Sequence, residues 1–291
     1  MTQHKLPGRA DFRHLERHRV RWVEVDMQAI VFNGHYLMYF DTAVAGYWRA
    51  LALPYHDTMR ALEGDLYMRK ATVEYHGSAR YDQTLDIGIR CSNIGNSSIQ
   101  FDGGVFRQDK LLVGGELVYV FADPATQSSR PVPAALREVL LAFEAGEQML
   151  LVKTGPWADL AAHARAVRTV VFIDEQRIPP ELEWDSVDAE AVHALAQNRM
   201  GTALGTARAF TDPNGDFRIG RVAVLDPLRN SGIGRKLLDA LIEVGRVRGV
   251  RRVVLSAQVA AKDFYVRAGF AVTGEVYEDA GIAHVEMMRA L

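Results

Sequence analysis

The segment Arg229-Asn-Ser-Gly-Ile-Gly-Arg235 constrains the fold of this chain more than any other feature. It follows an apolar run, Phe217 to Leu225, that is typical of a buried strand. It also opens an amphipathic stretch, Gly232 to Arg248, that is typical of a helix. The first amides of a helix have no acceptor within the helix, and the two glycines let an anion approach them closely. The segment therefore predicts a pyrophosphate cradle, although a plain strand–turn–helix unit would fit it as well.

A second motif, Lys262-Asp-Phe-Tyr-Val-Arg-Ala-Gly-Phe270, lies farther along the chain. The two motifs together resemble the GNAT acetyltransferase pattern, Arg-x-x-Gly-x-Gly followed by Phe-Tyr-x-x-x-Gly-Phe. The stretches Val171 to Pro179, Glu183-Trp-Asp185 and Glu275 to Met287 resemble the ElaA-like branch of that superfamily. The resemblance covers most of Leu150 to Leu291 and implies a mixed central sheet with flanking helices.

The resemblance implies a site for acetyl-CoA as co-substrate. The backbone of Val222 and Val224 would bind the pantetheine arm, and Tyr265 would donate a proton to the leaving thiolate. A free thiol titrates near ~8.5 and a phenol near ~10, so the phenol can supply that proton; alternatively, Tyr265 is a core aromatic residue. The full set of implied coenzyme-binding residues is Val222, Ala223, Val224, Arg229, Asn230, Ser231, Gly232, Ile233, Gly234, Arg235 and Phe264.

The acceptor amine must lose a proton before it attacks, and the sequence offers several general bases. The candidates are Glu175, Glu183, Asp185 and His284, each of which has a structural or surface role as its alternative. Glu183, in the loop on the substrate side, is the preferred one. Gln258, at the end of a predicted strand, is expected to face the acyl carbonyl as a substrate-binding residue.

The N-terminal half carries a second informative stretch, Arg21 to Asp41, in which Asp26 precedes a long helical pattern. A carboxylate near a helix N-terminus can attack a thioester or activate water. This stretch, Val73 to Asp82 and Arg90 to Phe101 resemble the 4-hydroxybenzoyl-CoA thioesterase-like hotdog family of the YbgC/FadM type. The resemblance covers about Arg13 to Ala122 and implies a long helix wrapped by an antiparallel sheet.

The hotdog resemblance makes Asp26 the nucleophile or general base of thioester hydrolysis. Asn33 and His35 would orient water or bind the substrate, unless they are a helix cap or surface residues. The sequence departs from the family pattern, because Glu24 replaces the first acid of the motif and Met27-Gln28-Ala29 follows the second. Asp26 itself is retained, so hydrolysis stays the leading prediction for this half.

The pattern of apolar residues predicts an α+β domain over residues 1–146 and an α/β domain over residues 147–291. Helices are expected over His35 to Leu53, Ala134 to Ala145, Trp157 to Val171, Gly232 to Arg248 and Ala260 to Ala268. Strands are expected over His18 to Val25, Leu66 to Tyr75, Thr84 to Ile94, Ser97 to Arg107, Lys110 to Phe121, Leu150 to Lys153, Ala189 to Asn198, Gly201 to Thr211, Phe217 to Leu225, Arg252 to Ala257, Phe270 to Tyr277 and His284 to Arg289.

Composition limits the classes of binding partner and the cellular location that we expect. The net charge of −2 provides no field that would favour nucleic acid or an anionic membrane. A single cysteine, Cys91, excludes a disulfide framework and a cysteine-based metal site, and we expect no metal. No apolar run approaches the ~18 residues of a membrane helix, and Met1 to Leu15 lacks the apolar core of a signal peptide. We therefore expect a cytoplasmic protein.

The leading hypothesis is a bifunctional acyl-CoA enzyme that acetylates an unidentified amine and hydrolyses an acyl-CoA. Hotdog domains pair their sheets between chains, so a homodimer or larger assembly is expected. The main alternative is an acetyltransferase whose hotdog domain serves only oligomerisation or acyl-CoA sensing. A third possibility is a CoA-binding regulator in which neither half turns over.

Overall fold

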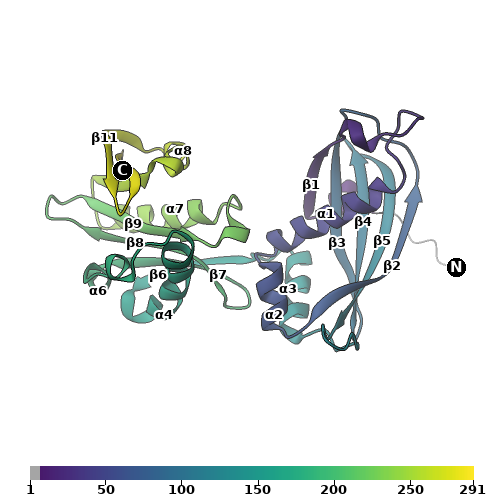
Figure 1. Ribbon diagram of the computed structural model, residues 1–291, viewed down its shortest axis with the longest axis horizontal. Helices are drawn as coiled ribbons and strands as arrows, with labels where there is room; N and C mark the ends of the chain where they lie inside the picture. Colours follow the sequence, from purple (N-terminus) through teal and green to yellow (C-terminus); the bar gives the residue numbers. More distant parts are fainter. Residues whose placement is uncertain (1–6) are drawn as a thin grey trace. The chain divides into compact units, whose positions relative to one another are not determined.

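A computed structural model describes residues 7–291 (Figure 1). The chain divides between Met149 and Leu150 into two compact units, here called unit 1 and unit 2. Among the helices described, none is long and apolar enough to cross a membrane.

Unit 1 is a single antiparallel sheet crossed by one long helix, as Figure 1 shows. Its strands lie in the order β1-β3-β4-β5-β2, so that β2 forms an edge. The elements are β1 (His14–Arg19), α1 (His35–Ala50), α2 (Tyr55–Ala61), β2 (Asp65–Tyr75), β3 (Thr84–Ile94), β4 (Ser98–Arg107), β5 (Lys110–Ala122) and α3 (Ala134–Glu144). Two 3-10 turns, Arg9–Asp11 and Trp22–Glu24, precede α1.

Helix α1 packs closely on the centre of this sheet. The fully buried ring of Phe40 lies over Gly103 of β4 and Gly115 of β5, which pair with each other. A Cβ atom would lie 2.6 Å from this ring at Gly103 and 2.5 Å at Gly115. Both positions therefore require glycine for the helix to approach. The predicted hotdog arrangement of a helix against an antiparallel sheet is confirmed.

Unit 2 is a seven-stranded mixed sheet in the order β11-β12-β10-β9-β8-β7-β6. Figure 1 shows α7 and α4 on opposite faces of this sheet. The elements are β6 (Leu150–Pro156), α4 (Trp157–Arg168), α5 (Pro180–Glu183), α6 (Val187–Glu190), β7 (Val192–Asn198), β8 (Ala203–Thr211), β9 (Phe217–Val224), α7 (Ile233–Val247), β10 (Arg252–Gln258), α8 (Lys262–Arg267), β11 (Ala271–Asp279) and β12 (Ile282–Ala290). The predicted mixed sheet with flanking helices is confirmed.

The two central strands of unit 2 separate along their length. Strands β9 and β10 pair in parallel only from Phe217 to Ile219, and beyond that point no register between them is formed. Strand β9 also carries an extra residue opposite β8, and Arg221 within this bulge has φ +52°. Such a bulge bends a strand away from its neighbour. The carboxyl end of β9 is thereby open on the side that faces β10.

Two predicted elements are wrong in their extent. The strand predicted over His18 to Val25 is instead β1, which ends at Arg19, followed by the 3-10 turn Trp22–Glu24. The Glu24 carboxylate closes that turn by accepting a hydrogen bond from the Arg21 amide at 2.7 Å. The helix predicted to end at Val171 leaves α geometry at Arg168 and continues as a π-helix, Thr169–Glu175.

Candidate functional site

The glycine-rich loop of unit 2 forms the predicted turn at the start of α7. Gly232 caps the helix in the left-handed conformation, with φ +86°, and Asn230 before it has φ +63°. The first amide that bonds back into the helix is that of Lys236, which donates to the Gly232 carbonyl at 3.1 Å. The Ser231 amide donates to the Leu228 carbonyl at 3.4 Å, whereas the amides from Gly232 to Arg235 have no acceptor among the residues that the structure describes and are left to an outside one such as a phosphate.

Both arginines of this loop have partners within the protein. The guanidinium of Arg229 donates to both carboxylate oxygens of Glu175, at 2.7 and 2.6 Å, and to the Val224 carbonyl at 3.1 Å. Arg235 pairs with Asp239 one turn farther along α7, at 2.9 Å. An incoming pyrophosphate would compete with these carboxylates, so the backbone amides are the free part of the cradle.

The carboxyl end of β9 presents backbone groups toward the open side of the sheet. The Leu225 amide donates to Leu204 of β8 at 3.0 Å. Successive residues of a strand turn their peptide groups in opposite directions, so the Val224 amide points away from β8. This orientation suits the predicted pantetheine contact. Phe264 of α8 adjoins the cradle, since a Cβ atom on Gly234 would lie 3.4 Å from its ring.

A cavity of about 450 Å³ lies where β9 and β10 separate. Tyr265 lines it from α8 and is 8% exposed. Burial raises the pKa of Tyr265 to about 12, so its hydroxyl keeps its proton throughout the neutral range. The predicted residues Val222, Glu183, Gln258 and His284 line the same cavity, which brings together side chains far apart in the sequence.

The three acidic candidates for the general base all accept hydrogen bonds from arginines. Glu175 pairs with Arg229 as described, and the hydrogen bond from Arg229 holds the pKa of Glu175 below its usual value. Asp185 accepts two hydrogen bonds from Arg208, both of 2.6 Å, and these likewise lower its pKa. Neither carboxylate lines the cavity around Tyr265.

Glu183, the preferred candidate, is 1% exposed and has both carboxylate oxygens occupied. One oxygen lies 2.5 Å from Nε of Arg168, and the other lies 2.9 Å from Nε of Arg221. Burial raises the pKa of Glu183, while the two guanidiniums oppose that effect. Its role as general base stays a prediction that this geometry disfavours, because an amine proton has no free carboxylate oxygen to reach.

His284 and Gln258 face each other across β12 and β10. Nδ1 of His284 lies 2.8 Å from the Ile282 carbonyl, which can only accept, so the ring proton is on Nδ1. The lone pair of Nε2 is then available as a base. The side-chain NH2 group of Gln258 donates to the side-chain oxygen of Gln176 at 3.0 Å. This hydrogen bond does not use the side-chain oxygen of Gln258.

Sequence analysis missed a buried ion network behind this cavity. The guanidinium of Arg168 lies between the rings of Trp157 and Trp184, at 5.7 and 4.6 Å from their centroids. It also pairs with Asp188 at 2.7 Å, and Arg208 pairs with the same oxygen at 2.7 Å. Nothing in the local spacing separates Arg168 from Arg165, the other arginine of α4. Only the fold reveals this network.

In unit 1, Asp26 lines a second cavity of about 550 Å³ near the start of α1. Asn33, Tyr36 and Tyr75 line it as well, whereas His35, the first residue of α1, does not. One oxygen of Asp26 accepts the Gln28 amide at 2.8 Å. The loop is closed by a bridge between Val25 and Val31. The structure thus places Asp26 and Asn33 together.

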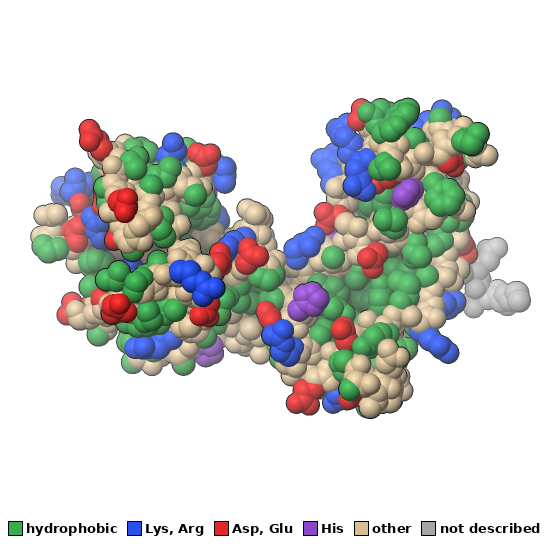
Figure 2. Space-filling view, viewed as in Figure 1, with side chains coloured by type: hydrophobic (Ala, Val, Ile, Leu, Met, Phe, Trp, Pro, Cys, Tyr) green, Lys and Arg blue, Asp and Glu red, His purple; other side chains and the backbone are tan. Residues whose placement is uncertain are grey.

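Apolar side chains are exposed around this cavity. Trp22 is 74% exposed and packs edge-on against Tyr81, and Met27 and Phe32 are exposed as well. Figure 2 shows apolar side chains gathered at the upper end of unit 1. An apolar rim of this kind, formed by Trp22, Met27 and Phe32, is typical of a surface that another molecule covers.

Glu24, the first acid of the motif, serves structure rather than chemistry. It is 1% exposed and accepts hydrogen bonds from His18 at 3.0 Å, from the Arg21 side chain at 2.8 Å and from Tyr39 at 2.9 Å. Burial alone would raise the pKa of Glu24, but these bonds and that of the Arg21 amide lower it to about 2. The network joins β1, α1 and the loop that carries Asp26.

We expect Glu24→Gln to destabilise unit 1 by about 2 kcal/mol at pH 7, the scale of hydrogen bonds to a charged group. Because the pKa of Glu24 is depressed, this contribution is present above about pH 4.5 and declines as the pH falls toward about 2. Urea-dependent hydrogen exchange of peptides from β1 and α1, at pH 7 and pH 3, measures the difference. An exposed control, Glu74→Gln, should change little; an equal loss at both pH values would contradict this role of Glu24.

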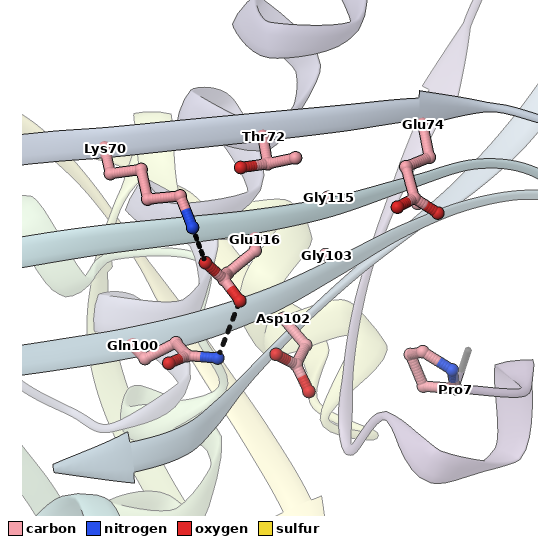
Figure 3. Close-up of a pocket in the computed structure, with 10 residues that line it drawn as sticks. Pro7, Lys70, Thr72, Glu74, Gln100, Asp102, Gly103, Gly115 and Glu116 are labelled. Atoms are coloured by element: carbon pink, nitrogen blue, oxygen red, sulfur yellow. Dashed lines mark hydrogen bonds and ion pairs between the residues drawn. The ribbon is translucent and has the colours of Figure 1, made fainter. Parts of the chain in front are cut away.

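A third cavity, of about 380 Å³, lies on the sheet of unit 1 and contains none of the predicted site residues. Figure 3 shows Lys70 and Gln100 converging on Glu116, with hydrogen bonds of 2.7 and 3.2 Å. Asp102 beside them pairs with Arg90 at 3.0 Å. Since strand neighbours alternate between faces, these side chains lie opposite the face that Phe40 covers.

Residues 7–291 contain no group of three or more His, Cys, Asp or Glu side chains that could hold a metal ion.

Comparison with known proteins gives separate matches for the two units. Residues 166–291 match the acetyltransferase (GNAT) domain family, and residues 28–113 match the thioesterase superfamily. The uncharacterized N-acetyltransferase YjcF of Bacillus subtilis is 32% identical over 42% of this chain and 87% of its own. An acyl-CoA N-acyltransferase from Pseudomonas aeruginosa, of known structure, is 33% identical over 48% of this chain and 99% of its own, with a TM-score of 0.44. A probable thioesterase from Bartonella henselae is 17% identical over 41% of this chain and 98% of its own, with a TM-score of 0.39.

The two matches cover most of the predicted site residues. The GNAT match includes the cradle and Tyr265, and the thioesterase match includes Asn33 but begins two positions after Asp26, at Gln28. The resemblances found in the sequence are confirmed at the level of the two families. The chain belongs to the GNAT acetyltransferase family through unit 2, and its unit 1 has a hotdog arrangement and matches the thioesterase superfamily over residues 28–113.

Proposed function

We propose that this protein is a bifunctional acyl-CoA enzyme, with unit 2 transferring an acetyl group to an amine and unit 1 hydrolysing an acyl-CoA. The observation that carries the proposal is the convergence of three features in unit 2. The first feature is the set of amides at the start of α7, and the second is the open carboxyl end of β9 that leads to it. The third is the adjoining cavity, which Tyr265 lines. A CoA thioester laid along β9 would have its pyrophosphate at the cradle and its carbonyl in the cavity.

In this proposal, the amides from Gly232 to Arg235 hold the pyrophosphate, and the backbone of Val222 and Val224 holds the pantetheine arm. Metal plays no part in the proposed steps. Tyr265 is protonated at neutral pH and donates to the thiolate as the C–S bond breaks. His284, with its free Nε2, is the base that we favour over Glu183.

Tyr265→Phe should lower kcat for acetyl transfer about ten- to a hundredfold, since general acid catalysis contributes on this scale. The KM for acetyl-CoA should change little, because the ring still fills its buried site. Mass spectrometry of acetylated products from a panel of amines provides the assay. Calorimetric titration with CoA is the control for an intact donor site; an unchanged kcat would remove Tyr265 from the reaction.

In unit 1 we propose that Asp26 acts as nucleophile or general base, with Asn33 orienting the substrate or water. Tyr75 donates to the Asn33 carbonyl at 3.1 Å, which fixes the backbone beside Asp26. Strand β2 at the edge of the sheet has β5 as its one strand neighbour within residues 7–291. Together with the exposed apolar rim, this edge supports a homodimer through unit 1, which sedimentation would detect.

A further inference from the structure

We infer that unit 2 takes as acceptor a primary amine with an apolar body and no carboxylate beside the nitrogen, and that Asp279 binds its ammonium group. The inference rests on the proposed acetyl transfer and names the class of acceptor. It follows from three features of the cavity around Tyr265. These are the charged lining residues that have no ion partner, the apolar part of the lining, and the position of His284.

The arginines that line this cavity are already neutralised. Arg208 pairs with Asp185 at 2.6 Å, and its Nε, which has no partner in residues 7–291, is enclosed by protein and out of reach of a ligand. Arg221 pairs with Glu183 at 2.9 Å. A carboxylate on the acceptor would therefore find no guanidinium free to receive it, and its desolvation would be uncompensated.

Arg218, the third arginine of the cavity, pairs with Glu286 at 3.0 Å. Asp279, in contrast, lines the cavity without an ion pair or side-chain hydrogen bond to any residue that the structure describes. It ends β11 and pairs through its backbone with Ile282, the first residue of β12. The one unneutralised charge that the described residues present to the cavity is thus negative, as an ammonium group requires.

Part of the cavity lining outside the hairpin of β11 and β12 is apolar. Phe172 belongs to the π-helix and Ile178 to the turn after it, and both line the cavity. Leu182 and Phe210 complete this apolar wall. Phe172 and Ile178 also pack together with the core of unit 2, so the wall is fixed in place. A ligand with an aromatic or branched aliphatic body would bury its surface here.

The chemistry then proceeds with each proton accounted for. Nε2 of His284 takes one proton from the ammonium, which gives a neutral amine whose lone pair attacks the thioester carbon. The C–N bond forms, the C–S bond breaks, and the thiolate takes a proton from Tyr265. The new amide nitrogen releases its second proton through solvent to the tyrosinate. The net products are the N-acetyl amine, CoA with a free thiol, and one proton held by His284 until it passes to solvent.

Two ligands of the same skeleton separate this inference from its alternatives. 2-Phenylethylamine and phenylalanine differ only by the carboxylate beside the nitrogen. Calorimetric titration of each into the full chain loaded with CoA should show at least tenfold tighter binding of 2-phenylethylamine. Asp279→Asn should weaken that binding about tenfold. The matched control is Glu278→Gln, which makes the same change of charge one residue earlier, on the other face of β11, and should leave it unchanged.

Equal or tighter binding of phenylalanine would overturn the inference, as would binding of 2-phenylethylamine that Asp279→Asn does not alter. Acetyl transfer is assayed separately with the same two ligands. Binding in the expected order without any transfer would uphold the acceptor class and reject the proposed activity. Acetyl transfer to phenylalanine as efficient as transfer to 2-phenylethylamine would uphold the proposed activity and reject the acceptor class.

Discussion

Gly232→Ala should raise the dissociation constant of acetyl-CoA for unit 2 at least tenfold. The residue has φ +86° at the start of α7, where a side chain costs about 1–2 kcal/mol in the left-handed conformation. Relief of this strain would turn the loop and move the amides of the cradle away from the pyrophosphate. A change of 1.4 kcal/mol corresponds to a factor of ten in binding. Calorimetric titration with acetyl-CoA measures the change directly.

The matched control is Gly215→Ala, in the turn between β8 and β9. Gly215 has φ +79°, and a Cβ atom there would meet nothing within 4 Å, as at Gly232. The two substitutions therefore introduce similar strain, but only one lies in the cradle. If both variants bound acetyl-CoA like the parent, the loop from Arg229 to Arg235 would not be the pyrophosphate site.

Asp26→Asn should lower acyl-CoA hydrolysis by about 10²–10⁴-fold while leaving acetyl transfer by unit 2 intact. The amide that replaces the carboxylate can neither attack a thioester nor accept a proton from water. Hydrolysis is followed by the release of free thiol from a panel of acyl-CoA substrates of different chain length. The same preparation is assayed for acetyl transfer.

Asp109→Asn, in the turn between β4 and β5, makes the same substitution away from the cavity and should have no effect. Hydrolysis that is absent in the parent, or equal in the parent and Asp26→Asn, would reject a hydrolytic role for unit 1. The hotdog unit would then serve oligomerisation or acyl-CoA sensing, which sedimentation and CoA titration distinguish.

The two folds could be predicted because their motifs are local. The cradle needs only a strand, two glycines and a helix in sequence, and α7 begins within one residue of the predicted position, at Ile233. Tyr265 and Asp26 were found by the same kind of local pattern. Both line cavities in the structure, although their chemical roles remain proposals.

The rest of the site depends on contacts between distant residues, which periodicity does not encode. The pairing of Glu183 with Arg168 and Arg221 joins α5, α4 and β9, and it changes a candidate base into a buried partner of two cations. The turn at Glu24 replaces a predicted strand because its carboxylate accepts from four donors on His18, Arg21 and Tyr39. In each case the contacts of one side chain, and not the local pattern of apolar residues, determine the structure.

The central claim is that one chain holds two separate acyl-CoA sites, one in each unit. Calorimetric titration with a thioether analogue of an acyl-CoA, which neither unit can cleave, tests it most directly. We predict two molecules bound per chain, with Gly232→Ala weakening one of the two binding events and leaving the other as in the parent. A single molecule bound per chain, whose binding is lost with Gly232→Ala, would contradict the claim.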